Sequence, residues 1–218
     1  MKPVRIWFEK KDAARYISHL DLNRCISRAI HQARIPLWYT EGFNPHAFLT
    51  FALPLPLGVQ GDRESFDIRL ESEMEESELI SRLNRSLPEG IRVFAAKDPQ
   101  MKPGKIAYAF YRIELEPDEE GAGEFCQKLQ GLFGRDEILM EKKTKSGVKQ
   151  VNLKRYLGET QVKEEDGKVV IEAMLPAGSE ENVSPLLLTG AVEAYLTPNY
   201  SAFVERKNLF DAEKKESA

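Results

Sequence analysis

The spacing of apolar residues divides the first half of the chain into strands and helices. Residues 4–10, VRIWFEK, are rich in β-forming side chains and predict a strand. A helix over 19–35 is predicted by apolar residues that recur every three or four positions, namely Leu22, Ile26, Ala29 and Ala33. Ser18 is the expected N-cap of this helix and Pro36 ends it.

The next sixty positions complete a recognisable order of elements. Short strands are expected over 37–40 and 47–53, a strand over 64–71, an amphipathic helix over 75–87 and a closing strand over 91–97. The order is strand, helix, strand or hairpin, strand, helix, strand. This is the βαββαβ order of a ferredoxin-like unit.

The second half repeats the same order more weakly. Its expected elements are a strand at 106–116, a helix at 119–133, a hairpin around Ser146 and Gly147, a strand at 168–175, a helix at 181–196 and a last strand at 201–210. We therefore predict an α+β protein with two ferredoxin-like halves in tandem. The halves span 1–98 and 106–210, a linker covers 99–105, and 211–218 form a disordered tail.

Composition narrows the class of protein. Hydrophobic residues make up 42% of the 218 positions, enough for a sizeable core. The net charge of −4 does not indicate a nucleic-acid binder, although a local basic face would still attract phosphates. Cys25 and Cys126 are far apart, which argues against a zinc or iron–sulfur site held by this chain. We expect a cytoplasmic protein with no metal, no cofactor and no membrane partner.

A polar group around the turn of 39–48 is the first candidate for chemistry. It comprises His19, Asp21, Tyr39, Glu41, Asn44 and His46. If the start of the first helix meets this turn, these side chains form one binding pocket beside a rigid scaffold. The alternative is structural: Asp21 caps the helix, Asn44 satisfies a tight turn, and His46 donates to a backbone carbonyl.

A basic stripe is the second candidate. Its phosphate-binding residues are Lys11, Arg15, Arg24 and Arg28. Arg24 and Arg28 are four positions apart, on the helix face opposite the apolar residues, and Asp21 is the only acidic residue of that helix. The alternative is an ordinary solvated helix face.

Two further segments allow more than one interpretation. The hairpin of 141–156 is rich in lysine and ends at Tyr156, so it either holds phosphates and stacks a base or is an edge protected by lysines. The apolar segment 51–59 contains two prolines. It either wraps the core or exposes a patch for a partner.

The stretch of 15–58, from RYISHLD through GFNPH to PLPLG, resembles the signature of a bacterial family of radical-SAM-associated proteins of unknown function. The matching residues are Arg15, Ser18, His19, Leu20, Asp21, Arg24, Arg28, Gly42, Phe43, Asn44, Pro45, His46, Pro54, Leu55, Pro56 and Gly58. Ala47 and Phe48 depart from the family pattern, in which a proline and a lysine usually follow the histidine. The resemblance implies a stand-alone family member whose partner is a radical SAM enzyme.

Together these features favour an accessory protein over an enzyme. We expect it to bind tRNA or rRNA and to present this RNA to a radical SAM modification enzyme, with no catalytic residue of its own. One alternative is a metal-independent endoribonuclease with His19 and His46 as acid and base. The other is a protein-only adaptor that docks its partner through the apolar segment 51–59.

Overall fold

The computed structural model describes residues 2–41, 43, 45–144, 147–196 and 198–216. In this part of the chain the fold is mixed α+β, with four α-helices and largely antiparallel strand pairing. Contacts divide the chain into two compact units. One comprises Met1–Ile106 with Asn208–Ala218, and the other comprises Ala107–Lys207. The last residues thus group with the first unit.

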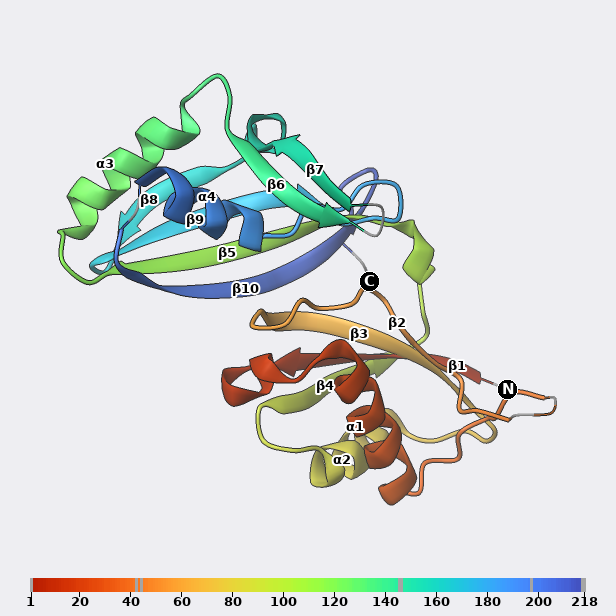
Figure 1. Ribbon diagram of the computed structural model, residues 1–218. Coiled ribbons are helices and arrows are strands. Elements are labelled where there is room, and N and C mark those ends of the chain that lie inside the picture. Colours follow the sequence, from red (N-terminus) through yellow and green to blue (C-terminus); the bar gives the residue numbers. More distant parts are fainter. Residues whose placement is uncertain (1, 42, 44, 145–146, 197, 217–218) are drawn as a thin grey trace. The chain divides into compact units, whose positions relative to one another are not determined.

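The first unit is a small sheet with two helices on one face (Figure 1). Its elements are β1 (Lys2–Lys10), α1 (His19–Gln32), β2 (Leu49–Phe51), β3 (Gln60–Leu70), α2 (Glu76–Ser86) and β4 (Ile91–Lys97). The strand order is β4-β1-β3, with β2 on the other side of β3, and each of these pairs is antiparallel. In register, Ile6 of β1 lies between Phe66 of β3 and Ala96 of β4.

The core of this unit follows from two periodicities. Alternate residues of β1, namely Val4, Ile6 and Phe8, point to the helix-covered face because strand side chains alternate. They meet the buried stripes of the helices, Leu22, Ile26 and Ile30 of α1 and Leu79 and Leu83 of α2. The polar faces of both helices are thereby left to solvent.

The start of α1 is capped as its sequence predicts. The Ser18 Oγ accepts a hydrogen bond from the backbone N–H of Asp21 at 3.2 Å, and the helix begins at His19. The helix ends at Gln32, three residues earlier than predicted, with Ala33 as its C-cap. Pro36 follows and cannot continue it.

The second unit has a comparable sheet with an added hairpin (Figure 1). Its elements are β5 (Ile106–Pro117), α3 (Ala122–Phe133), β6 (Leu139–Thr144), β7 (Gly147–Asn152), β8 (Gln161–Glu165), β9 (Lys168–Pro176), α4 (Leu186–Leu196) and most of β10 (Tyr200–Asp211). The strand order is β10-β5-β9-β8, and β6 and β7 pair separately as the expected hairpin. α3 packs against β8 and β9, and α4 packs against β6.

The largest differences from the sequence predictions lie in three segments. Residues 37–40 form no strand and contribute only the isolated bridges Leu37 with Leu70 and Tyr39 with Ala47. β8 was not predicted. The described part of the predicted tail, 211–216, continues β10 into a turn in which Asp211 accepts from the backbone N–H groups of Glu213 and Lys215. No described helix is long and apolar enough to cross a membrane.

Candidate nucleic-acid interface

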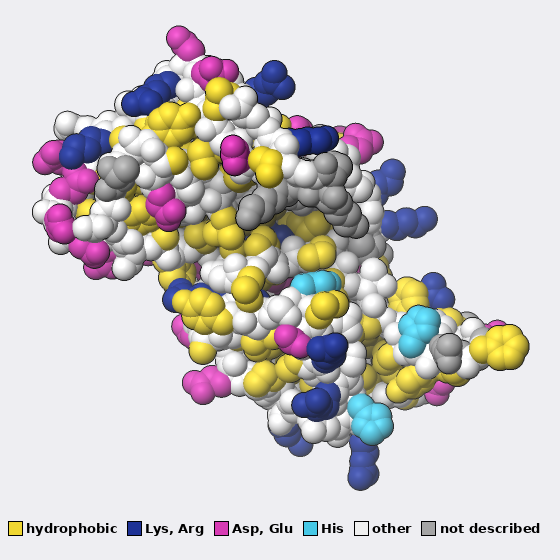
Figure 2. Space-filling view, in the orientation of Figure 1, with side chains coloured by type: hydrophobic (Ala, Val, Ile, Leu, Met, Phe, Trp, Pro, Cys, Tyr) yellow, Lys and Arg dark blue, Asp and Glu magenta, His cyan; other side chains and the backbone are white. Residues whose placement is uncertain are grey.

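A surface depression of about 740 Å³ lies between α1 and the end of α2. Three arginines line it: Arg24 and Arg28 from α1, and Arg85 from the last turn of α2. Asp21 is the one carboxylate among its described lining residues. Figure 2 shows dark blue cationic side chains over α1 in the orientation of Figure 1. The depression therefore carries an excess of positive charge.

Helix geometry explains why the arginines meet here. Arg24 and Arg28 are one turn apart and exposed, because the apolar residues of α1 are buried on the opposite face. An Arg82 N–H donates to the Arg34 carbonyl at 3.5 Å, which places the end of α1 beside α2. The end of α2 then lies along the middle of α1. The Arg85 guanidinium donates to the Ser81 Oγ at 2.9 Å, one turn back.

Asp21 at the rim of the depression is held as a carboxylate. The Ser18 hydroxyl donates to one of its oxygens at 2.7 Å, and Arg24 donates to the other at 3.0 Å. These two bonds, the Ser18 bond first, hold the pKa of Asp21 below its usual range. The Arg24 side chain is nevertheless 74% exposed and can turn its remaining N–H groups to a ligand.

The other two predicted phosphate ligands have local partners. Lys11 pairs with Asp62 at 2.8 Å and with Glu9 at 3.4 Å, and the Asp62 bond is the main cause of its raised pKa. The Arg15 guanidinium lies 4.8 Å from the ring centre of Tyr16 and donates to its hydroxyl at 2.8 Å. Neither Lys11 nor Arg15 is among the described residues that line the depression.

The two histidines of the predicted polar pocket have different partners. His19, the first residue of α1, is half-buried and packs its ring edge against Phe51 of β2, 5.0 Å between ring centres. His46 lies in the turn before β2. Its ring Nδ1 is 3.0 Å from the Thr40 Oγ1, and its backbone N–H donates to the same oxygen at 3.1 Å. Tyr39 and Glu41 are exposed near this turn. Asn44 lies outside the described residues.

The contact of His19 with Phe51 and the contact of His46 with Thr40 are separated along the chain. Phe51 follows His46 by five positions along mostly extended backbone. At about 3.3 Å per residue this is roughly 16 Å of chain. The structure thus brings Ser18, Asp21 and Arg24 together at the start of α1, and it pairs Thr40 with His46 further along the turn.

The lysine-rich hairpin of the second unit is engaged by its own unit. Lys142 donates to the carbonyl of Asn182, and Lys154 donates to the carbonyl of Phe133 at 2.9 Å. The hydroxyl of Tyr156 donates to Glu181 at 2.7 Å. These bonds hold Tyr156 and two of the lysines to the body of the unit, and they favour the structural interpretation of the hairpin.

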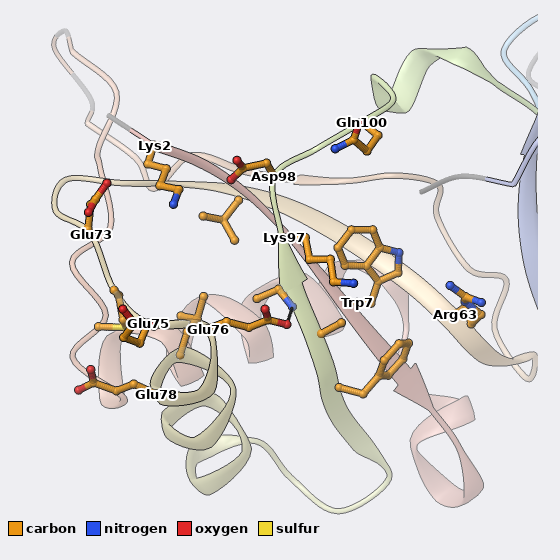
Figure 3. Close-up of a pocket in the computed structure, with 16 residues that line it drawn as sticks. Lys2, Trp7, Arg63, Glu73, Glu75, Glu76, Glu78, Lys97, Asp98 and Gln100 are labelled. Atoms are coloured by element: carbon orange, nitrogen blue, oxygen red, sulfur yellow. Dashed lines mark hydrogen bonds between the residues drawn. The ribbon is translucent and has the colours of Figure 1, made fainter.

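A second depression, of about 710 Å³, lies where the start of α2 meets β4 (Figure 3). Its carboxylates are Glu73, Glu75, Glu76, Glu78 and Asp98. They stand against the cations Lys2, Arg63 and Lys97. The Glu76 carboxylate accepts from the backbone N–H of Ala96 at 3.2 Å, so part of this acidic group supports the strand. The surplus of carboxylates disfavours phosphate here.

The described residues contain no group of three or more His, Cys, Asp or Glu side chains placed to hold a metal ion. Of the residues that line the arginine depression, Arg85 escaped the sequence-based reasoning. It lies on a different helix from Arg24 and Arg28, and only tertiary packing brings the three together. Its position in the last turn of an amphipathic helix is typical of a cation near a helix C-terminus and gave no sign of a ligand.

The chain is similar in sequence to one protein family and is also matched by solved structures. One solved structure, titled "Crystal Structure of an Unknown Protein from Galdieria sulphuraria", matches 94% of this chain and 98% of its own at 13% identity, with a TM-score of 0.28. A comparison with curated proteins finds no match. A family model described as "Uncharacterized protein conserved in bacteria (DUF2344)" matches residues 3–185, most of the chain. The chain therefore belongs to the DUF2344 family of uncharacterized bacterial proteins.

Proposed function

We propose that the chain is an RNA-binding accessory that presents tRNA or rRNA to a radical SAM modification enzyme. The observation that carries the RNA-binding part is the arginine depression, in which Arg24, Arg28 and Arg85 face one carboxylate. Guanidinium groups stay charged at every physiological pH and pair with phosphate oxygens through two parallel hydrogen bonds. The phosphate groups of an RNA backbone would take the place of the water molecules that hydrate these arginines.

The helix presents its arginines in line. Four residues of α-helix rise about 6 Å, so Arg24 and Arg28 offer two successive contacts along one direction. Arg85 supplies a third contact from the facing helix. Such contacts fix the position of a backbone without reading its sequence.

The radical SAM part of the proposal rests on the resemblance of residues 15–58, the segment that contains both α1 arginines. We further propose that each unit is a ferredoxin-like half. The strand orders β4-β1-β3 and β10-β5-β9-β8, each with a helix after its first strand and another before its last, support this proposal.

The test is a salt series of RNA binding for the wild type and for Arg24→Ala/Arg28→Ala. Three phosphate contacts predict that the logarithm of the affinity falls with the logarithm of salt at a slope of about −2, and the variant should drop to roughly −0.7. Arg92→Ala/Arg135→Ala is the matched control, because both arginines are exposed and lie elsewhere. Absence of binding at low salt, or equal losses in both variants, would refute the proposal.

The protein-only adaptor is the second candidate, because Leu57 is 58% exposed. Leu55 is buried, so only Leu57 of this pair can contact a partner. Leu57→Glu should abolish capture of the radical SAM enzyme while leaving RNA binding intact if the apolar segment docks that enzyme. We do not propose the nuclease, because it needs His19 and His46 at one phosphate and their described contacts lie at two places.

A further inference from the structure

We infer that the RNA segment bound at the arginine depression is single-stranded and stacks an unpaired base on Tyr16. This inference deepens the proposed function and rests on it. The bound RNA would be single-stranded, and Tyr16, which a phosphate site does not require, would contact one of its bases.

Tyr16 is an aromatic ring presented to solvent in a fixed position. It is the last residue of a short 3₁₀ helix (Asp12–Tyr16), and it is 63% exposed. The Arg15 guanidinium lies over the ring and bonds its hydroxyl. An exposed tyrosine usually loses conformational entropy when a ligand binds to it. The guanidinium over the ring already restricts the Tyr16 side chain, so less entropy is lost on binding.

Two contacts tie the segment that carries Tyr16 to residues at the depression. The 3₁₀ helix packs on the loop after α2, where the Lys11 N–H donates to the Gly90 carbonyl at 2.7 Å. Gly90 is two residues from Pro88, which lines the depression. A Cβ at Gly90 would come within 2.9 Å of the Ala14 side chain, so this approach is close. Ser18 follows Tyr16 by two residues and bonds Asp21 at the rim.

Leu20 continues this apolar surface toward the arginines. It is 69% exposed and lies one helical turn before Arg24 and two turns before Arg28. Over about 12 Å of helix the exposed stripe thus changes from apolar to cationic. A nucleotide strand with a base at the apolar end and phosphates at the cationic end matches this order.

A duplex cannot use such a surface fully. Its bases are stacked inside, so it offers phosphates to the arginines but no ring face to Tyr16. Proteins that bind single strands combine a basic track with aromatic side chains on which bases stack. The stripe of Tyr16, Leu20, Arg24 and Arg28, completed by Arg85, has both parts.

The experiment compares an unstructured 12-nucleotide RNA, the same sequence as a duplex, and the equivalent DNA strand by fluorescence anisotropy. The proteins are the wild type, Tyr16→Ala, Tyr16→Leu, Tyr16→Phe and Arg24→Ala/Arg28→Ala. We expect the wild type to prefer the single strand over the duplex. Tyr16→Ala and Tyr16→Leu should lose about tenfold in single-strand affinity with the salt slope unchanged, whereas Tyr16→Phe keeps the ring and should bind like the wild type.

The outcomes distinguish failure of single-strand stacking on Tyr16 from failure of RNA binding as a whole. Equal binding of duplex and single strand, with Tyr16→Ala unchanged, would overturn the inference and leave the proposed function standing. Failure of every RNA to bind at low salt would overturn both. A stronger affinity for the DNA strand than for the RNA would overturn the assignment of RNA as the ligand. Circular dichroism of each variant checks the fold, which an exposed side chain should not disturb.

Discussion

At the scale of single residues, Asp21 decides how much positive charge the depression offers. It is ionised at neutral pH, because bonds from Ser18 and Arg24 hold its pKa below the usual range. The stability that these bonds of the carboxylate give the start of α1 is therefore fully present above the ordinary pKa of an aspartate and is lost only as the pH falls through the lowered value. Asp21 thus supports the helix and opposes the binding of phosphates.

Asp21→Asn should strengthen RNA binding. The amide oxygen can still accept from the Ser18 hydroxyl, while the negative charge beside Arg24 disappears. We expect the affinity at low salt to rise about two- to fivefold, the order expected for one exposed charge. Glu41→Gln removes one charge from the exposed turn near His46 and is the control. A loss of affinity in Asp21→Asn would instead mean that the carboxylate itself binds the ligand.

Cys25 provides a natural reporter inside the depression. It is half-buried, and burial raises the pKa of its thiol, with Arg28 acting in the opposite direction. Its thiolate therefore forms only at pH values above the ordinary range. Cys126 is buried in the second unit and serves as an internal reference.

Bound RNA should slow the alkylation of Cys25. In the free protein at pH 9 we expect iodoacetamide to modify Cys25 slowly and Cys126 more slowly still. A saturating single strand should reduce the Cys25 rate several-fold, measured by mass spectrometry of the intact and digested protein. Unchanged Cys25 alkylation under saturation would show that the RNA lies elsewhere.

At the scale of elements, the strand β4 ends the sheet of the first unit, and α2 covers its free edge. The Asn84 amide donates to the Val93 carbonyl and accepts from the Val93 N–H, both at 2.8 Å. Glu76 accepts from the next outward N–H, that of Ala96. Two side chains of one helix thus replace the partner strand that β4 lacks.

Asn84→Ala should destabilise the first unit. It leaves the Val93 N–H and C=O without their described partner, which costs on the order of 1–3 kcal/mol when such groups are buried. Urea unfolding measures the loss, and light scattering measures any new association through the open edge. Ser77→Ala, an exposed position on the same helix, is the control. Equal stability of the two variants would show that water replaces Asn84.

Elements with a periodic pattern of buried residues could be predicted from the sequence. Elements that form only by pairing or packing with distant segments of the chain could not. α1 with its Ser18 cap and β4 have clear patterns and were located closely. β8 escaped because its residues are mainly exposed and polar, such as Lys163 and Glu164, and only its pairing with β9 makes it a strand. Arg85 escaped for the same reason, since a partner from another helix leaves no local signal.

At the scale of the whole molecule, overall charge and local charge point in different directions. The chain carries −4, yet three arginines share one depression with a single described carboxylate. Carboxylates concentrate instead around the start of α2 and β4. The net charge of the chain therefore does not describe the charge of this local surface.

The predicted linker, 99–105, groups with the first unit, and Arg5 of β1 holds it there. This buried side chain donates to Asp67 at 2.8 and 3.1 Å and to the carbonyl of Met101. Arg5→Lys keeps the charge but cannot make all of these bonds at once. We expect trypsin to cleave after Lys105, which Ile106 follows, several-fold faster in this variant. Arg69→Lys, which loses stacking on Phe48 in the same unit, is the control, and equal cleavage rates would contradict the idea.

The walls of the arginine depression come from two helices that are far apart in the chain. A ligand held by both walls would bind only while the helices are packed, so it would act as a thermal stabiliser of that packing. At a concentration one hundred times its Kd this amounts to about 2.7 kcal/mol. Conversely, a change deep in the core that loosens the helix pair, such as Leu83→Ala, would present itself first as a weak ligand affinity rather than as an unfolded protein.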